Sequence, residues 1–90
     1  MDAVEIVLYE GAGCGLCGRA AELLEREAPR LGFRLRRIAI DGDDVLERRY
    51  RVELPVVVVD GEVAFTQAVA AGPLERAVGL AQARRRKAGS

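Results

Sequence analysis

The chain has 90 residues, of which 50% are hydrophobic and 31% are charged, and its 14 basic and 14 acidic residues cancel to a formal net charge of zero. This balance argues against a nucleic-acid partner, a membrane surface or an acidic partner. The absence of histidine removes the usual general base and the usual metal ligand. The length fits a single domain over residues 1–90.

The N-terminal segment predicts no export signal. It carries Asp2 and Glu5 and lacks the basic and apolar regions of a secretory leader. The longest apolar run, Pro55 to Val59, has the length of a strand rather than of a membrane span. We therefore expect a cytoplasmic monomer, in a compartment where static structural disulfides are rare.

The first half of the chain predicts a strand, a helix and a second strand. Val4–Tyr9 is β-branched and mostly apolar, as in a buried strand. After a glycine-rich turn, apolar residues three and four positions apart predict an amphipathic helix from Gly15 to about Leu31. We expect Pro29 to kink this helix or to end it a residue or two early. Alternation over Phe33–Ile40 predicts the second strand. The predicted buried stripe of the helix consists of Cys17, Ala20, Ala21, Leu24, Ala28 and Leu31.

A short helix is predicted next, over about residues 45–50. Asp43 or Asp44 can cap its first turn. Its partly apolar face is predicted to carry Val45, Leu46, Arg49 and Tyr50.

The second half of the chain predicts a hairpin and a closing helix. Asp60-Gly61 between two β-branched runs is typical of a two-residue hairpin turn. Pro73 suits the first turn of a helix whose last turn is basic. We interpret residues 83–90 as the basic end of this helix and a frayed tail, with the Arg84–Lys87 run solvated rather than bound to a partner. The predicted buried stripe of the helix is Leu74, Ala77, Val78 and Ala81.

The chain's two cysteines, Cys14 and Cys17, lie where the first turn meets the first helix. Backbone N–H groups at a helix N-terminus lack partners within the helix, and they stabilise a thiolate at Cys14. Cys17 lies one turn later on the apolar stripe and is expected to be more buried. We therefore predict that Cys14 attacks a substrate disulfide and that Cys17 resolves the mixed disulfide. The small residues Gly13 and Gly15 allow a substrate to approach Cys14, and Leu16 adds an apolar contact.

Two other interpretations of the pair stay open. Structural zinc requires four Cys or His ligands, which this chain does not have, so we predict no metal site within one chain. Both cysteines can also be inert buried residues, a description that suits Cys17 better than Cys14.

The segments "LYEGAGCGLCGRAAELLE" and "YRVELPVVVVDGE", with the closing helix, resemble the glutaredoxin-like proteins of the thioredoxin superfamily. The resemblance implies an α/β thioredoxin-like fold of order β-α-β-α-β-β-α, with a four-stranded mixed sheet flanked by helices. It also implies a cis peptide bond at Leu54-Pro55, with Pro55 against the cysteine pair. The backbone of Leu54 would then pair with an extended substrate or with glutathione.

The chain departs from that family in the residues that choose the electron donor. Gly15-Leu16 replaces the Pro-Tyr of glutaredoxins, Gly11 to Gly13 holds no lysine, and "FTQAVAAGPLE" lacks a Gly-Gly pair. The tryptophan and buried acid of thioredoxins are replaced by Gly13 and Leu8. The donor, a reductase or glutathione, is therefore left open.

We predict a thiol–disulfide oxidoreductase that reduces disulfides in proteins or in small thiol compounds. The chemistry requires no cofactor, and glutathione is a candidate reductant or ligand. One alternative is a dimeric or glutathione-assisted module for an iron–sulfur cluster or another soft metal. The other is a thioredoxin-fold interaction domain without turnover.

Overall fold

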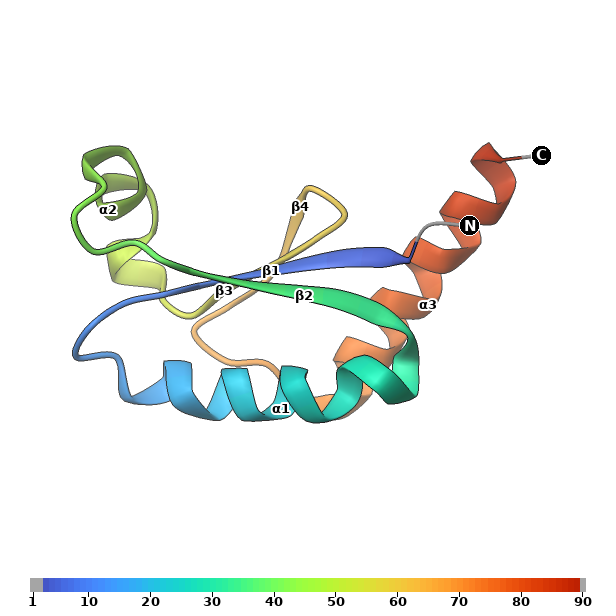
Figure 1. The fold of residues 1–90 in the computed structure, drawn as a ribbon, viewed down its shortest axis with the longest axis horizontal. Coiled ribbons are helices and arrows are strands. Elements are labelled where there is room, and N and C mark those ends of the chain that lie inside the picture. The colour runs from blue at the N-terminus through green and yellow to red at the C-terminus, as the bar shows by residue number, and fades with distance from the viewer. Residues whose placement is uncertain (1–2, 90) are drawn as a thin grey trace.

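The structure is a computed structural model and describes residues 3–89. Four strands and three helices follow one another in the predicted order (Figure 1). They are β1 (Val4–Glu10), α1 (Gly15–Leu31), β2 (Phe33–Ala39), α2 (Asp44–Tyr50), the 3₁₀ turn η1 (Arg51–Glu53), β3 (Val56–Val59), β4 (Glu62–Thr66) and α3 (Ala71–Ala88).

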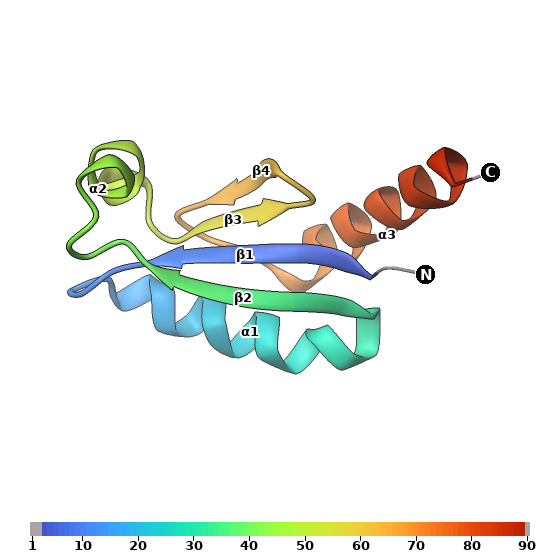
Figure 2. The same cartoon turned by 45° about the horizontal axis from the view of Figure 1, so that its top comes forward.

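The sheet is mixed, with the strand order β2-β1-β3-β4 (Figure 2). β1 and β2 run parallel, as the crossover through α1 requires, whereas β3 lies antiparallel to both β1 and β4. The ends of β1 and β2 therefore lie side by side, with Glu10 opposite Ala39. The loops that follow these two strands, residues 11–14 and 40–43, meet at this edge of the sheet.

The helices cover the two faces of the sheet unequally. α1 and α3 lie together on one face, whereas the short α2 lies on the other face near the ends of β1 and β2 (Figure 1). Alternate residues of β1 point into the larger layer, where Ile6 and Leu8 are fully buried. They pack with Leu24 of α1 and Leu74 of α3, which are also fully buried.

α1 has the predicted bounds, and of the two effects expected of Pro29, a kink or an early end, the early end does not occur. The helix continues through Pro29 to Leu31, where Gly32 ends it in a left-handed conformation with φ 79°. Proline removes one helical hydrogen bond, to the carbonyl of Glu25. Because Glu25 is exposed, water can replace that bond, which explains why the helix tolerates the proline so close to its end.

Glu27 is a buried residue that the predicted stripe left out, with 7% of its surface exposed. Arg30 donates to its carboxylate from Nη2 at 2.5 Å and from Nε at 3.1 Å. This hydrogen bonding lowers the pKa of Glu27 and keeps the carboxylate charged. Arg30 also reaches Glu75 at 3.7 Å, so the cluster joins α1 to α3.

The short helix α2 packs on the sheet through an aromatic contact. Tyr50 stacks on Tyr9 of β1 with ring centroids 4.5 Å apart, and the guanidinium of Arg49 lies 5.3 Å from the Tyr50 centroid. Asp43 caps the helix by accepting a hydrogen bond from the Leu46 N–H. The prediction that Val45 shares the apolar face is wrong, because its side chain is 62% exposed.

The hairpin and α3 form as predicted, with α3 starting two residues before Pro73 at Ala71. Asp60 and Gly61 both have positive φ, of 47° and 85°, as the tight turn requires.

The basic end of α3 makes ion pairs with the hairpin. Asp60 accepts hydrogen bonds from the Glu5 N–H and from Arg85, and Arg84 pairs with Glu62. Part of the basic run is therefore paired with the hairpin. The predicted frayed tail begins at residue 88, which is still helical, and Ser90 lies outside the described residues.

Candidate active site

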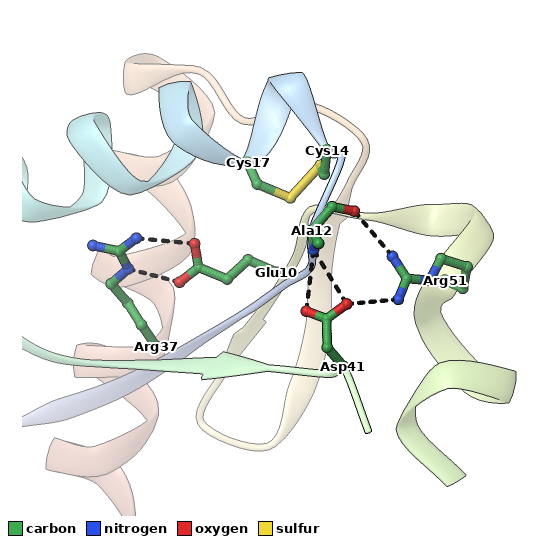
Figure 3. Close-up of a disulfide and its surroundings, with 7 residues drawn as sticks. All are labelled: Glu10, Ala12, Cys14, Cys17, Arg37, Asp41 and Arg51. Atoms are coloured by element: carbon green, nitrogen blue, oxygen red, sulfur yellow. Dashed lines mark hydrogen bonds and ion pairs between the residues drawn. A yellow bond between two sulfur atoms is a disulfide. The ribbon is translucent and has the colours of Figure 1, made fainter. Parts of the chain in front are cut away.

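Cys14 and Cys17 lie at the N-terminus of α1, as the sequence predicted, and are joined by a disulfide (Figure 3). Cys14 is the residue that precedes the first turn, and its backbone is extended. Cys17 lies inside that turn, which brings the two Cα atoms within 5.4 Å. The local helical geometry therefore places the two sulfurs within bonding distance.

The two cysteines differ in exposure. Cys17 is 3% exposed and packs in a small hydrophobic cluster with Ile40, Tyr50, Leu54 and Val56. Cys14 is partly buried at the edge of this cluster and reaches the surface. Leu16, between them, is 48% exposed. A reagent arriving from solvent therefore meets Cys14 first.

The turn before Cys14 is shaped by glycine at two positions. Gly13 has φ 77°, a left-handed conformation that other residues adopt at a cost. A Cβ on Gly11 would lie 2.9 Å from Cδ1 of Leu54 and 3.0 Å from Nη1 of Arg51. Gly11 therefore lets the turn pack closely against the segment that carries Leu54.

The Leu54-Pro55 peptide bond is cis, which confirms the expectation from the resemblance. Leu54 is 8% exposed, and Pro55 is fully buried. A shallow pocket of about 370 Å³ opens beside Cys14, with Leu54 in its wall. The pocket brings together five of the seven predicted site residues, Gly13, Cys14, Gly15, Leu16 and Leu54, while Cys17 and Pro55 do not line it.

The rest of the pocket is lined by Ala12 and Arg51, which are not among the seven predicted site residues. Arg51 donates from Nη1 to the carbonyl oxygen of Ala12 at 3.2 Å and from Nη2 to Asp41 at 2.9 Å. Asp41 accepts from the Ala12 N–H at 3.1 Å and 3.3 Å, so both polar groups of one residue are held (Figure 3). The signal in the sequence is topological: Asp41 follows a strand parallel to the strand that leads to the cysteines.

Hydrogen bonds favour the charged forms of Asp41 and Arg51. The guanidinium of Arg51, followed by the Ala12 N–H, lowers the pKa of Asp41 below its usual value. Arg51 also donates to Glu47 from Nε and Nη2, at 2.9 Å and 2.5 Å. Two carboxylates thus face one guanidinium.

A second ion-pair cluster joins Glu10 of β1, Arg37 of β2 and Glu25 of α1. Arg37 donates to both oxygens of Glu10, at 2.7 Å and 2.9 Å (Figure 3). It also donates to Glu25 of α1 at 3.2 Å. Glu10 in particular raises the pKa of Arg37. These contacts join side chains only, so this cluster links β1, β2 and α1 without holding the backbone of the turn.

Two further findings concern residues 3–89. Within this range, no three Cys, Asp or Glu side chains lie close enough together to form a metal site. No helix in the same range is sufficiently long and apolar to cross a membrane.

Comparison with known proteins gives a family match. The model of the family described as "Glutaredoxin-like domain (DUF836)" matches residues 5–78. Uncharacterized protein Rv0508 of Mycobacterium tuberculosis is 35% identical over 66 residues, which cover 68% of this chain and 68% of that protein. Uncharacterized protein Mb0520 of Mycobacterium bovis matches with the same identity and coverage.

Solved structures share the fold at lower identity. Protein Ne2328 of Nitrosomonas europaea aligns with a TM-score of 0.73 and 22% identity, covering 87% of this chain and 94% of that one. A mutant thioredoxin from Halobacterium salinarum aligns with a TM-score of 0.65 and 20% identity, covering 88% of this chain and 74% of that one. These likenesses show that the chain has a thioredoxin-like fold.

Proposed function

Because the chain belongs to the glutaredoxin-like domain family (DUF836), we propose that it is a thiol–disulfide oxidoreductase that uses Cys14 and Cys17. The observation that carries this proposal is the unequal burial of two bonded cysteines at a helix N-terminus. Cys17 is 3% exposed, whereas Cys14 opens onto the pocket. Disulfide exchange requires one accessible thiolate and one resolving thiol held within reach.

The reaction begins with the reduced pair. The Cys14 thiolate attacks one sulfur of a substrate disulfide, whose S–S bond breaks, and the second substrate sulfur leaves as a thiolate that takes a proton from water. Cys17 then loses its proton to solvent and attacks Sγ of Cys14, which releases the first substrate sulfur. Two electrons have passed to the substrate, and the Cys14–Cys17 disulfide remains.

The backbone around Cys14 supports the first step. N–H groups of the first turn of α1 and the positive end of the helix dipole stabilise the thiolate. We therefore expect the pKa of reduced Cys14 to lie below about 8.5, the ordinary value for a thiol. Leu16 and Leu54 give the pocket apolar walls, and the Leu54 backbone is the proposed pairing site for an extended substrate.

We propose disulfide reduction in the cytosol, on proteins or small disulfide compounds, because the thiol pools there are reducing. The cycle then needs a donor of two electrons, either glutathione or a dithiol of a reductase. Incubating the oxidised protein with each donor, and following free thiols, distinguishes the two. No resident cofactor takes part in the proposed steps.

Redox titration followed by alkylation tests the function. The protein is equilibrated in buffers of stepped potential, alkylated, and weighed by mass spectrometry. We expect one two-electron transition between the dithiol and the disulfide. Absence of an intramolecular disulfide at every potential would overturn the dithiol mechanism.

Single cysteine variants test the two roles. Cys14→Ser should lose all disulfide reductase activity, whereas Cys17→Ser should still form a mixed disulfide with oxidised glutathione and fail to resolve it. Activity retained in Cys14→Ser would show that the roles are assigned wrongly. Iron and a coloured chromophore in freshly purified protein would instead support the cluster-binding alternative, in which thiolates of two chains hold the cluster.

A further inference from the structure

The turn before Cys14, residues 11–13, is held mainly by hydrogen bonds from other segments of the chain rather than by hydrogen bonds within the turn. Its internal hydrogen bond, from the Cys14 N–H to the Gly11 carbonyl, measures 3.4 Å and is long for such a bond. Gly11 and Gly13 both lack a side chain that could restrict the backbone. A turn of this composition samples many conformations unless other contacts restrict it.

Asp41 and Arg51 supply those contacts, Asp41 from the loop after β2 and Arg51 from the first residue of η1. Asp41 follows β2 and accepts from the Ala12 N–H, while Arg51 follows α2 and donates to the Ala12 carbonyl. Arg51 and Asp41 are bonded to each other at 2.9 Å, which closes a ring around the Ala12 backbone. We refer to Ala12, Asp41 and Arg51 as the turn clamp.

We propose that Asp41 and Arg51 are positioning residues that hold the Gly11–Gly13 turn and thereby set the reactivity of Cys14. The inference deepens the proposed function, on which it rests. With the turn held, the Cys14 sulfur stays at the N-terminus of α1. With the turn free, the sulfur spends part of its time away from the N–H groups that stabilise its thiolate.

The clamp also balances charge beside the pocket. Arg51 lines the pocket with Cys14 and is faced by Asp41 and Glu47. The charged residues Glu10, Glu25 and Arg37 pair with one another in the separate cluster of β1, β2 and α1. Asp41 therefore affects Cys14 in two ways. Its charge opposes a thiolate, and its hydrogen bond to Ala12 favours one.

Two substitutions at Asp41 separate these effects. Asp41→Asn and Asp41→Ala both remove the negative charge, but only asparagine keeps an oxygen that can accept from the Ala12 N–H. Each variant is made in a Cys17→Ser background, so that Cys14 is the only thiol. The rate of alkylation by iodoacetamide against pH then gives the pKa of Cys14, and amide hydrogen exchange reports on Ala12.

The turn clamp predicts that Asp41→Asn and Asp41→Ala differ in the pKa of Cys14 and in the exchange rate of the Ala12 amide. We expect Asp41→Asn to lower the pKa of Cys14, and Asp41→Ala to leave it about half a unit to one unit above the Asn variant. The Ala12 amide should exchange at least about tenfold faster in Asp41→Ala than in Asp41→Asn. Arg51→Gln should raise the pKa, because it removes both a cation and the donor to Ala12. Arg84→Gln, which breaks an exposed ion pair far from the turn, is the matched control and should change neither value.

Equal pKa values and equal Ala12 exchange in the Asn and Ala variants, both folded by circular dichroism, would overturn the proposal. So would an Arg84→Gln shift as large as the Arg51→Gln shift. Alkylation needs a free thiol but no turnover. If the wild-type protein shows no redox transition, the proposed function is wrong. The alkylation and exchange measurements would still test the turn clamp, because they do not depend on turnover.

Discussion

The larger hydrophobic cluster lies between the sheet and the pair α1 and α3, whereas the smaller one lies beside the disulfide. Ile6, Leu8, Leu24 and Leu74 are all 0% exposed in the larger cluster. The smaller cluster consists of Cys17, Ile40, Tyr50, Leu54 and Val56. The larger cluster joins three strands and two helices, while the smaller one gathers loop and helix ends around a reactive group.

The different positions of the two clusters indicate that the larger one mainly stabilises the fold and that the smaller one mainly shapes the surroundings of the cysteine pair. Buried apolar area sets the hydrophobic contribution to folding, and most of it lies in the larger cluster. The smaller cluster includes Cys17 itself, and Leu54 lines the pocket beside Cys14. Changes in the larger cluster should therefore alter unfolding, whereas changes around the smaller one should alter the chemistry of the pair.

The largest expected effect is on stability, from Leu24→Ala in the larger cluster. The substitution removes three side-chain carbons from a fully buried position and leaves a cavity. We expect the free energy of unfolding to fall by about 2–5 kcal/mol, a large share of the roughly 5–15 kcal/mol that a domain has in total. Chemical denaturation measures this change.

The matched control is Leu80→Ala on α3, where the leucine is 62% exposed and the expected change is within about 0.5 kcal/mol. The midpoint potential of the Cys14–Cys17 pair should stay unchanged in Leu24→Ala at temperatures where the variant is folded. A shift of the potential as large as in variants near the turn would contradict the different roles of the two clusters.

The order of elements could be predicted from the sequence because the signals are local. β-branched apolar runs and one alternating segment marked the strands, helical spacing of apolar residues marked the helices, and Asp60-Gly61 marked the hairpin turn. The errors came from tertiary contacts. Val45 is exposed and does not belong to the apolar face of α2, and Glu27 is buried because Arg30 satisfies its carboxylate. A hydrophobic pattern shows neither the exposure of Val45 nor the burial of Glu27.

The site was predictable in part for the same reason. Cys14 and Cys17 lie next to each other on one helix end, so their spacing alone brought them together. The cis bond at Leu54-Pro55 came from the family resemblance and not from spacing. The contacts of Asp41 and Arg51 with Ala12 could not be predicted, because they form only after the loop that follows β2 and the 3₁₀ turn η1 have come together. Such a contact depends on topology rather than on any motif.

A smaller effect is expected from Gly11→Ala, which tests the close packing of the turn against Leu54. The new Cβ would lie 2.9 Å from Leu54 and 3.0 Å from Arg51, so both side chains must move. Because both contacts are the ends of flexible side chains, we expect a loss of only about 1 kcal/mol, the low end for an overpacked site. The midpoint potential of the cysteine pair should shift as well.

Gly18→Ala, inside α1, is the matched control for this substitution. A Cβ on Gly18 meets no atom within 4 Å, and alanine is the better helix former, so we expect stabilisation by about 0.5–1 kcal/mol. Denaturation and redox titration of the two variants should therefore give opposite signs in stability and a change of potential only for Gly11→Ala. The same result for both would show that the turn is not closely packed.

The smallest effect is expected at Asp60, on the α3 side of the larger cluster, and it depends on pH. Arg85, followed by the Glu5 N–H, lowers the pKa of Asp60. A carboxyl group whose pKa is lower in the folded protein contributes stability above its unfolded pKa of about 3.9, and this contribution is lost as the pH falls through the folded pKa. Asp60→Asn keeps an acceptor and tolerates the positive φ of this turn, so it removes mainly the charge.

We expect Asp60→Asn to cost less than about 1 kcal/mol at pH 7, as a neutral hydrogen bond replaces a charge-assisted one. The cost should shrink toward zero as the pH falls from 5 to 2, and urea denaturation at stepped pH measures it. Glu22→Gln, which removes an exposed carboxylate on α1, is the matched control and should change the free energy of unfolding by less than about 0.5 kcal/mol. A constant difference between wild type and Asp60→Asn across this range would mean that the Asp60–Arg85 pair adds no charge-dependent stability. The hairpin turn would then be held to α3 by contacts whose strength does not depend on the charge of Asp60.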